Sequence, residues 1–277
     1  MLQSVSRIAQ SIQTEHSGAE PIMMHLEGPF INPEKRGDQS LENISRVDLG
    51  YAKELIAAGQ GKIKVMTFAP ELPNSTKLIE LLLNSGILPS MGHSLASEEE
   101  TLAAIEAGAS RCTYIFNAMP ALFHRSSSLT AVALTDDRVS IEIIADGFHL
   151  HSTIVKMILK CKKPDKLIAI SNAVLGETIP FDNQPAIIRN NYGILSGSNM
   201  GLKDIWKNLS TFGNMSEALA AACITANPAR DLGLLMRGEI YPGKFADFTL
   251  FSVKTNQILG TVKHGKFIFR REDFMES

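Results

Sequence analysis

The sequence predicts an α/β fold built on parallel strands, and three observations lead to this prediction. Apolar segments of strand length alternate with amphipathic segments of helix length over residues 1–172. The apolar segments are nearly continuous, as expected for parallel strands that helices cover on both faces. Polar residues follow several of these segments, at the end where α/β proteins build their active sites.

The elements are expected in alternating order after an N-terminal helix, whose apolar residues recur at helical spacing in Leu2, Val5, Ile8, Ala9 and Ile12. Six strands are predicted at Pro21–Leu26, Lys62–Ala69, Ile87–Gly92, Arg111–Phe116, Val139–Ala145 and Leu167–Ser171. Helices are predicted at Arg46–Ala58, Ser75–Asn84, Ser97–Ala107 and Ser152–Cys161. Ser97 is a suitable N-cap, and the three glutamates after it favour the positive end of a helix.

The pattern changes after residue 172. A short hairpin is predicted from Ile187–Arg189 and Gly193–Ser196, with its turn at Asn190-Asn191. Helices near Leu202–Thr211 and Ser216–Thr225 come next. Three short β segments end the chain, at Ala246–Phe251, Gln257–Val262 and Lys266–Phe269. We therefore expect two domains, 1–237 and 238–277, the second a small β module.

The number of strands leaves two architectures open. A (β/α)₈ barrel closes with eight strands and typically takes about 250 residues. This chain has 277 residues but only six predicted parallel strands. The six strands therefore form either an open sheet or a barrel that lacks its first two strands.

Composition narrows the classes of partner. The hydrophobic fraction of 44% supports a large core, and the formal net charge is −2. No Lys/Arg cluster indicates a nucleic-acid or membrane surface, and no apolar run is long enough to span a membrane, so a small-molecule partner is expected. The three cysteines lie far apart in sequence, at Cys112, Cys161 and Cys223. This spacing is typical of a cytoplasmic protein without disulfides.

Two strand ends carry residues that bind metals. Glu27 follows the first strand segment, and His93 follows the third. Each residue alone could be structural, but together at equivalent strand ends they predict part of a Zn²⁺ or Fe²⁺ site. A catalytic zinc usually holds three protein ligands. The next strand end offers Tyr114, whose phenol titrates near ~10 and so is a poor ligand at neutral pH.

Other polar residues follow the later strands. Asn117 could bind a polar ligand or cap a helix, and Arg125 lies in a loop where a guanidinium could hold a phosphate. His149 follows the fifth strand and could contact a sugar hydroxyl or a carbonyl. The sixth strand ends at Asn172, where an aspartate is expected. A carboxylate there could move a proton between water and a leaving amine, whereas a carboxamide has no basic lone pair near neutral pH.

These motifs, in this order, resemble the N-acetylglucosamine-6-phosphate deacetylases of the amidohydrolase superfamily. The matching segments are His25–Phe30, Gly92–Ser94, Phe116–Met119, Asp146–His149, Asn227–Arg230 and Gly238–Asp247. The resemblance implies a metal-dependent barrel with a small β-sandwich domain, usually dimeric. It implies hydrolysis of the acetamide of an amino-sugar phosphate, giving glucosamine 6-phosphate and acetate in amino-sugar catabolism.

Roles carried over by the resemblance assign Glu27 and His93 to a divalent metal, Zn or Fe. They assign Asn117, Ala118 and His149 to the sugar and Arg125 to the phosphate. Asn172 holds the position of the family's catalytic aspartate, and Tyr114 that of a metal-binding histidine. The segment that carries the family's first barrel strands and most of its β domain has no counterpart here, so an N-terminally truncated barrel of about six strands is expected.

These departures leave three interpretations open. The chain is a deacetylase with altered chemistry, a sugar-phosphate-binding protein that lacks catalysis, or a decayed fragment of the family.

Overall fold

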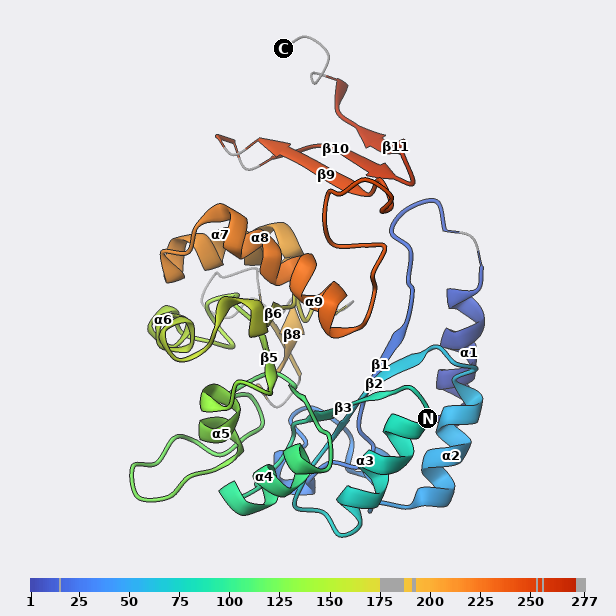
Figure 1. The fold of residues 1–277 in the computed structure, drawn as a ribbon, viewed down its shortest axis with the longest axis vertical. Coiled ribbons are helices and arrows are strands. Elements are labelled where there is room, and N and C mark those ends of the chain that lie inside the picture. Colours follow the sequence, from blue (N-terminus) through green and yellow to red (C-terminus); the bar gives the residue numbers. More distant parts are fainter. Residues whose placement is uncertain (15, 175–186, 191–192, 253, 256, 273–277) are drawn as a thin grey trace.

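A computed structural model describes residues 1–14, 16–174, 187–190, 193–252, 254–255 and 257–272. Its main sheet has six parallel strands in consecutive order, from β1 to β6 (Figure 1). They are β1 (Met24–Glu27), β2 (Ile63–Phe68), β3 (Leu88–Met91), β4 (Arg111–Cys112), β5 (Ser140–Ile143) and β6 (Leu167–Ala169). An open doubly wound sheet reverses its strand order at a switch point, and this sheet does not. The strands therefore form an incomplete (β/α)₈ barrel, as predicted, and the open-sheet alternative is excluded.

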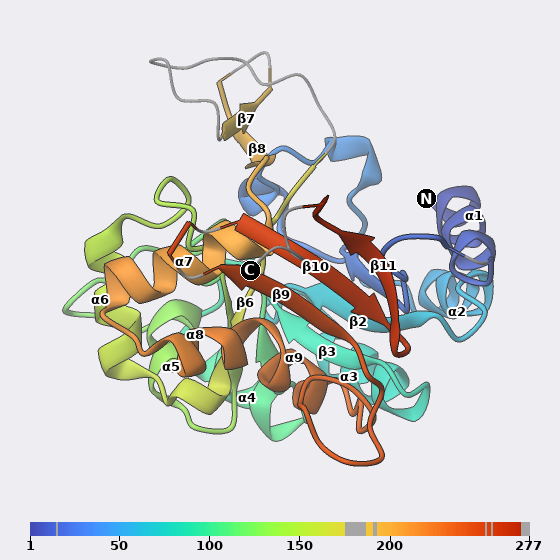
Figure 2. The ribbon, with the colours of Figure 1, turned by 90° about the horizontal axis from the view of Figure 1, so that it is seen from above.

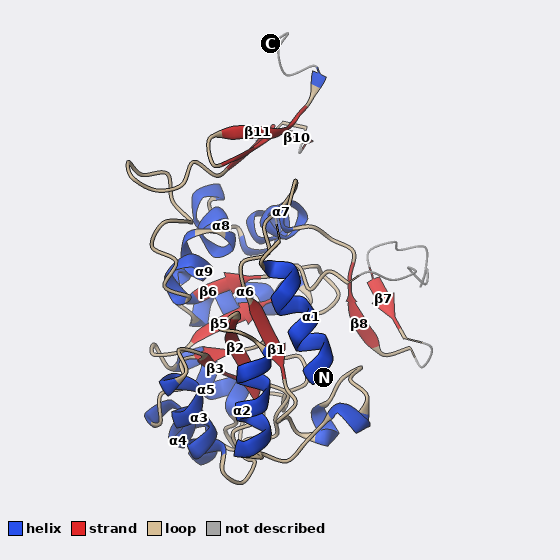
Figure 3. Ribbon diagram, turned by 90° about the vertical axis from the view of Figure 1, so that its right-hand side faces the viewer, coloured by secondary structure: helices blue, strands red, loops and turns tan. Residues whose placement is uncertain are grey.

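One helix precedes the first strand and the others follow β1 to β5, and all lie outside the sheet (Figures 1 and 3). These helices are α1 (Leu2–Ile12), α2 (Leu49–Ala58), α3 (Ser75–Asn84), α4 (Glu98–Glu106), α5 (Leu129–Thr135) and α6 (Ser152–Cys161). The predicted N-cap of α4 is confirmed, because the Ser97 side chain accepts from Glu100 N and the Glu100 side chain accepts from Ser97 N. Short 3₁₀ turns lie at Pro33–Lys35, Leu41–Asn43 and Pro164–Lys166.

The predicted strand Arg111–Phe116 was wrong beyond Cys112. Tyr114 and Phe116 have φ of 49° and 72°, which no strand residue adopts. The apolar side chains of Ile115 and Phe116 belong to a turn packed on the core, so their hydrophobicity was misread as strand. Helix α5 was not predicted, because its seven residues are too short to show helical periodicity.

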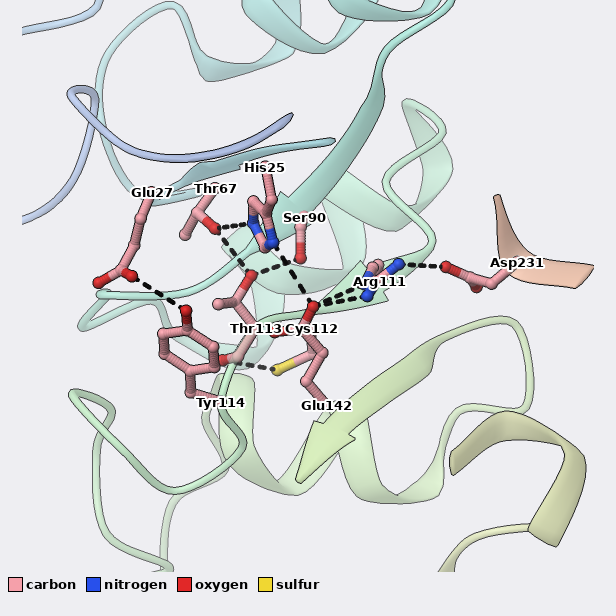
Figure 4. Close-up of polar contacts among 10 residues, drawn as sticks. All are labelled: His25, Glu27, Thr67, Ser90, Arg111, Cys112, Thr113, Tyr114, Glu142 and Asp231. Atoms are coloured by element: carbon pink, nitrogen blue, oxygen red, sulfur yellow. Dashed lines mark hydrogen bonds and ion pairs between the residues drawn. The ribbon is translucent and has the colours of Figure 1, made fainter. Parts of the chain in front are cut away.

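Polar side chains from neighbouring strands of the barrel are linked by hydrogen bonds and ion pairs (Figure 4). Three hydroxyls are linked in a chain: Thr67 Oγ1 lies 2.8 Å from Thr113 Oγ1, which lies 2.6 Å from Ser90 Oγ. The His25 Nε2 atom contacts Thr67 Oγ1 at 2.7 Å. Deeper in the barrel, Arg111 pairs with the buried Glu142 and with Asp231, at 2.6 and 2.7 Å.

Partial burial of His25 makes stability depend on pH. Desolvation lowers the pKa of His25 below its ordinary value of 6.5, although Glu142 lies 3.6 Å away and opposes this shift. The folded protein therefore binds this proton less readily than the unfolded chain. We expect the free energy of unfolding to fall as pH drops below about 6.5, and the His25→Gln variant to lose this part of the slope. The effect is measured by the urea midpoint of unfolding as a function of pH from about 5 to 8, the range in which histidine titrates.

His124 supplies the control for this prediction, because its side chain is exposed. The His124→Gln variant should keep the pH slope of the parent. An equal slope in the parent and in His25→Gln would contradict the assignment to His25.

Beyond β6 the chain forms a helical layer and two small sheets. The antiparallel pair β7 (Ile187–Arg189) and β8 (Leu195–Ser198) projects from the side of the barrel (Figures 2 and 3). It confirms the predicted hairpin strands, with the second strand starting two residues later than expected. Asn191, in the predicted turn, lies outside the described residues. Helices α7 (Leu202–Gly213), α8 (Glu217–Ile224) and the unpredicted α9 (Ala226–Asp231) follow.

A three-stranded antiparallel sheet ends the described chain, as predicted. It is formed by β9 (Phe248–Ser252), β10 (Gln257–Lys263) and β11 (Lys266–Arg270), and it matches part of a β-sandwich. The sheet lies at one end of the molecule, above α7 and α8 (Figure 1). Phe251 attaches it to α7, since its ring meets that of Trp206 edge to face with centroids 4.7 Å apart.

No helix among the described residues is long and apolar enough to cross a membrane.

Candidate active site at the carboxyl ends of the strands

Glu27 and His93 lie side by side, as expected from their positions at two strand ends. Glu27 is the last residue of β1, and His93 follows β3 after the single residue Gly92. The His93 Nε2 atom lies 2.8 Å from Glu27 Oε1. Gly92 permits this approach, because a Cβ there would lie 3.0 Å from the Thr113 side chain and 3.1 Å from that of Thr67. A side chain at residue 92 would therefore press on both threonines.

The hydrogen bonds of His93 leave its Nε2 atom free to bind a cation. Its Nδ1 atom lies 2.7 Å from the carbonyl oxygen of Lys35, so Nδ1 carries the hydrogen of a neutral ring. The Nε2 atom is buried and forms no hydrogen bond of good geometry among the described residues, although Glu27 Oε1 lies 2.8 Å away. Two electron-rich atoms at 2.8 Å thus face the same point, as metal ligands do.

Tyr114 completes this group as a hydrogen-bond donor. Its hydroxyl donates to Glu27 Oε2 at 3.0 Å (Figure 4). Burial and the nearby Glu27 charge raise the pKa of the Tyr114 phenol above its ordinary value of 10.0, so it stays neutral. Burial works against ionisation of Glu27 as well, but the charge that His93 carries when its ring is protonated and the hydrogen bonds from Gln39 and Tyr114 outweigh it and lower the pKa of Glu27 to about 2.

The donor set does not fit a catalytic zinc, which takes three protein ligands. Glu27 and His93 supply two, and the neutral Tyr114 phenol is engaged with Glu27. Across the described part of the chain, no three His, Cys, Asp or Glu side chains gather in a way that could hold a metal ion. Of the three ligands expected from the sequence, the structure brings Glu27 and His93 together, whereas Tyr114 is engaged as a hydrogen-bond donor to Glu27.

Four of the predicted site residues have left-handed backbone conformations. The φ angles are 49° at His93 and Tyr114, 53° at Ala118 and 48° at Asn172. Such angles are uncommon for residues other than glycine, and they cluster at functional sites, where the surrounding structure fixes them. The concentration of strained residues at the strand ends favours this region as the functional site.

Two residues that hold the site were missed by the sequence analysis. Gln39 donates from Nε2 to Glu27 Oε1 at 2.9 Å. Glu71 connects the loops after β1 and β3, because it accepts from Asn32 Nδ2 at 2.9 Å, Ser94 Oγ at 2.7 Å and Leu95 N at 2.6 Å. Glu71 could have been found as an acid that follows a predicted strand by two residues. No sequence signal marks Gln39.

The loop after β5 orients His149 toward Asn172. The buried Asp146 accepts from the backbone N–H groups of Phe148 and His149, at 2.9 and 2.8 Å. Its other oxygen lies 2.6 Å from His149 Nδ1. The His149 Nε2 atom in turn lies 3.4 Å from Asn172 Nδ2. The predicted residues His149 and Asn172 are therefore neighbours, and Asp146 supports them.

The remaining predicted residues lie in the loop after β4. Ala118 is tied to the His93 loop, since its carbonyl oxygen accepts from Ser94 N at 3.1 Å. Asn117 does not cap a helix; its Nδ2 donates to Ile115 O at 3.3 Å, and its side chain is partly exposed. Arg125 is exposed, and its Nε donates to His124 at 3.1 Å. The structure thus places Arg125 on an exposed surface loop.

Nearly the whole chain matches known proteins. The model of the amidohydrolase family matches residues 5–268. N-acetylglucosamine-6-phosphate deacetylase of Bacillus subtilis (strain 168) is 33% identical over 263 residues, covering 91% of this chain and 66% of that protein. N-acetylgalactosamine-6-phosphate deacetylase of Escherichia coli O157:H7 is 29% identical, covering 88% of this chain and 67% of that protein. The chain thus spans about two thirds of the length of the curated relatives that it matches.

Solved structures give the same result. A mutant of N-acetyl-D-glucosamine-6-phosphate deacetylase from Mycobacterium smegmatis, in complex with N-acetyl-D-glucosamine-6-phosphate, superposes with a TM-score of 0.87. It is 25% identical, and the match covers 96% of this chain and 72% of that one. The corresponding enzyme from Thermotoga maritima is 29% identical with a TM-score of 0.85, covering 98% and 76%.

Proposed function

The chain belongs to the amidohydrolase family, and from this premise we propose that it acts on N-acetylated hexosamine 6-phosphates. The proposed reaction is hydrolysis of the acetamide, which yields an amino-sugar phosphate and acetate, as in amino-sugar catabolism. One observation carries the proposal: the strand ends that bear Glu27 and His93 bring their side chains within 2.8 Å, in a fold shared with deacetylases of known structure.

Each side chain has a proposed role in binding. Asn117, Ala118 and His149 contact the sugar, since they lie in the loops after β4 and β5 that carry polar groups beside the site. Arg125 holds the phosphate, since its side chain is exposed on a loop and a guanidinium suits a bidentate grip on phosphate. Asn172 stands where a proton-transferring acid would stand, and its amide can only hydrogen-bond.

The amidohydrolase family is generally metal-dependent. For this chain we propose that Glu27 and His93 bind a divalent ion, Zn²⁺ or Fe²⁺, weakly. The support is the His93 Nε2 atom, which is buried without a hydrogen-bond partner in the described structure and faces a carboxylate. The engaged, neutral Tyr114 in place of a third ligand is the reason to expect low affinity.

Replacing Tyr114 by histidine should strengthen zinc binding. A neutral imidazole offers the lone pair that the protonated phenol withholds. Loss of a residue that only supports a metal ligand typically weakens metal affinity by ~10–100-fold. Because Tyr114→His adds a ligand itself, we expect this variant to bind Zn²⁺ more tightly than the parent by more than that factor. Competition with a chromophoric chelator measures both affinities. Tyr114→Phe is the control, since it removes the hydroxyl and adds no ligand; equal affinities in the Phe and His variants would contradict the proposal.

A second candidate function is sugar-phosphate binding without turnover. Asn172 favours it, because an amide keeps the size and hydrogen bonding of an acid and abolishes proton transfer. The binding residues Asn117, Arg125 and His149 do not depend on Asn172 for their chemistry. This candidate predicts affinity for the acetylated sugar phosphate and no release of acetate.

The proposed assembly and location follow from the same family. We propose a homodimer, the state that the resemblance implies, which light scattering on a size-exclusion column measures. All three cysteines are free thiols, which supports a reducing compartment such as the cytoplasm.

One pair of measurements tests these functions together. Calorimetry gives the affinity for N-acetylglucosamine 6-phosphate, with unphosphorylated N-acetylglucosamine as the control ligand. An assay of released acetate gives turnover with Zn²⁺ supplied. Acetate release that Glu27→Ala abolishes supports the hydrolase, and binding without release supports the second candidate. Folded protein that neither binds nor releases acetate overturns both.

The phosphate assignment has its own matched pair of variants. Arg125→Ala should weaken binding of the phosphorylated sugar and leave the weak binding of the unphosphorylated sugar unchanged. Arg138→Ala removes another surface arginine, in the turn before β5, and should change neither affinity.

A further inference from the structure

The pair formed by Asp146 and His149 is organised more tightly than sugar contact requires. The Asp146 side chain is fully buried, and the His149 side chain is 6% exposed. Both Asp146 oxygens are engaged: one accepts from two backbone N–H groups, and the other contacts His149 Nδ1 at 2.6 Å. A short contact of this kind fixes both the orientation of the ring and the position of its hydrogen.

The consequence of this arrangement is a defined base. A carboxylate only accepts hydrogen bonds, so the ring hydrogen of a neutral His149 sits on Nδ1. Its Nε2 atom then carries the lone pair, and this atom faces Asn172 Nδ2 at 3.4 Å. Good hydrogen bonds from N–H donors span about 2.7–3.2 Å, so this contact is weak. A water molecule can therefore displace the amide from Nε2.

We propose that His149, oriented by Asp146, carries the proton in acetamide hydrolysis by this chain, at the position where Asn172 cannot. This inference rests on the proposed function. Histidine suits the task because its ordinary pKa lies near neutrality, where a base is also a competent acid after it has taken a proton. Asp146 is a positioning residue, and His149 is the catalytic one.

The step balances without any further reactant. The oxygen of a water molecule bonds to the acetyl carbonyl carbon, and one of its hydrogens moves to His149 Nε2. The carbon–nitrogen bond of the acetamide then breaks as Nε2 returns that proton to the departing amine nitrogen. The second hydrogen of the water leaves with acetic acid and is released to solvent. No group is oxidised or reduced.

The test measures turnover of N-acetylglucosamine 6-phosphate at saturating substrate in four proteins: the parent, His149→Asn, Asn172→Asp and the double variant. Loss of a general acid/base costs about 10²–10⁴-fold. We expect His149→Asn to lower kcat by at least the lower figure in the parent background. In the Asn172→Asp background it should lower kcat tenfold or less, because the new carboxylate takes the proton. Asp146→Asn should lower kcat through the wrong ring tautomer and leave substrate affinity within a few-fold.

The outcomes separate this inference from the proposed function. Equal losses from His149→Asn in both backgrounds would mean a structural or binding role and would overturn the inference. An unchanged kcat in His149→Asn would overturn it as well. Substrate binding without turnover in the parent refutes the proton-carrier role and leaves the binding function standing. Absence of calorimetric binding by folded parent protein removes the proposed function itself.

Discussion

The Asn172→Asp variant should hydrolyse N-acetylglucosamine 6-phosphate faster than the parent protein. A positioned acid or base contributes ~10²–10⁴-fold to proton-transfer steps, and the amide of Asn172 contributes none. The side chains have the same shape, and Asn172 already holds a left-handed φ of 48°, a conformation that aspartate tolerates as well as asparagine. Because His149 carries a proton in the parent, the gain should fall near the lower figure. Release of acetate under saturating substrate and supplied Zn²⁺ measures it.

The matched controls separate chemistry from binding. Asn172→Leu keeps the approximate size and removes every hydrogen bond, so it should not exceed the parent rate. Adding Tyr114→His to Asn172→Asp supplies the missing metal ligand and should raise the rate further. If neither folded variant turns over faster than the parent, proton transfer at residue 172 is not what limits this protein.

The Arg111→Met variant should be severely destabilised. Arg111 is 5% exposed and neutralises Glu142, which is 1% exposed, and Asp231, which is 10% exposed. Methionine fills much of the volume but leaves two carboxylates in the barrel without a counter-charge. Removing one partner of a buried ion pair typically costs about 3–5 kcal/mol. Urea unfolding followed by far-UV circular dichroism measures the loss, and a protein that is already unfolded in buffer meets the expectation.

Arg138 provides the matched control, because it also pairs with two carboxylates but on the surface. Its side chain is 50% exposed and contacts Glu106 and Asp136 at 2.6 and 2.7 Å. Solvent screens such pairs, so Arg138→Met should leave the unfolding midpoint unchanged. Adding Glu142→Leu to Arg111→Met removes one buried charge and should recover part of the stability. Similar midpoints for Arg111→Met and Arg138→Met would refute the role of the buried pair.

The residues at the strand ends could be predicted because each of them directly follows an apolar strand segment in the sequence. Glu27, His93 and Asn172 each follow an apolar strand segment, and parallel strands bring their carboxyl ends to one edge of a barrel. The proximity of Glu27 to His93 therefore required only the correct strand order. The contact between Glu27 and His93 confirms that inference, and the consecutive order of β1 to β6 confirms the barrel over the open sheet.

The supporting contacts were not predictable, because they join residues far apart in sequence through side-chain geometry. Glu71 binds the loop that follows β1 and the loop that follows β3, and the backbone carbonyl of Lys35 sets the tautomer of His93. Neither function leaves a pattern in the sequence. The same holds for β4, where the left-handed turn at Tyr114 ended a segment whose hydrophobicity predicted a longer strand.

The sequence by itself determined the layered α/β architecture, the family resemblance and the residues that stand at the strand ends, because periodicity and residue type are local properties. Only the tertiary structure decided which of these residues touch. It joined Tyr114 to Glu27 as a neutral hydrogen-bond donor and turned His149 toward Asn172. The reason is physical: burial and the direction of each hydrogen bond set the charge and the tautomer of a side chain, and both arise from neighbours that the linear order does not specify.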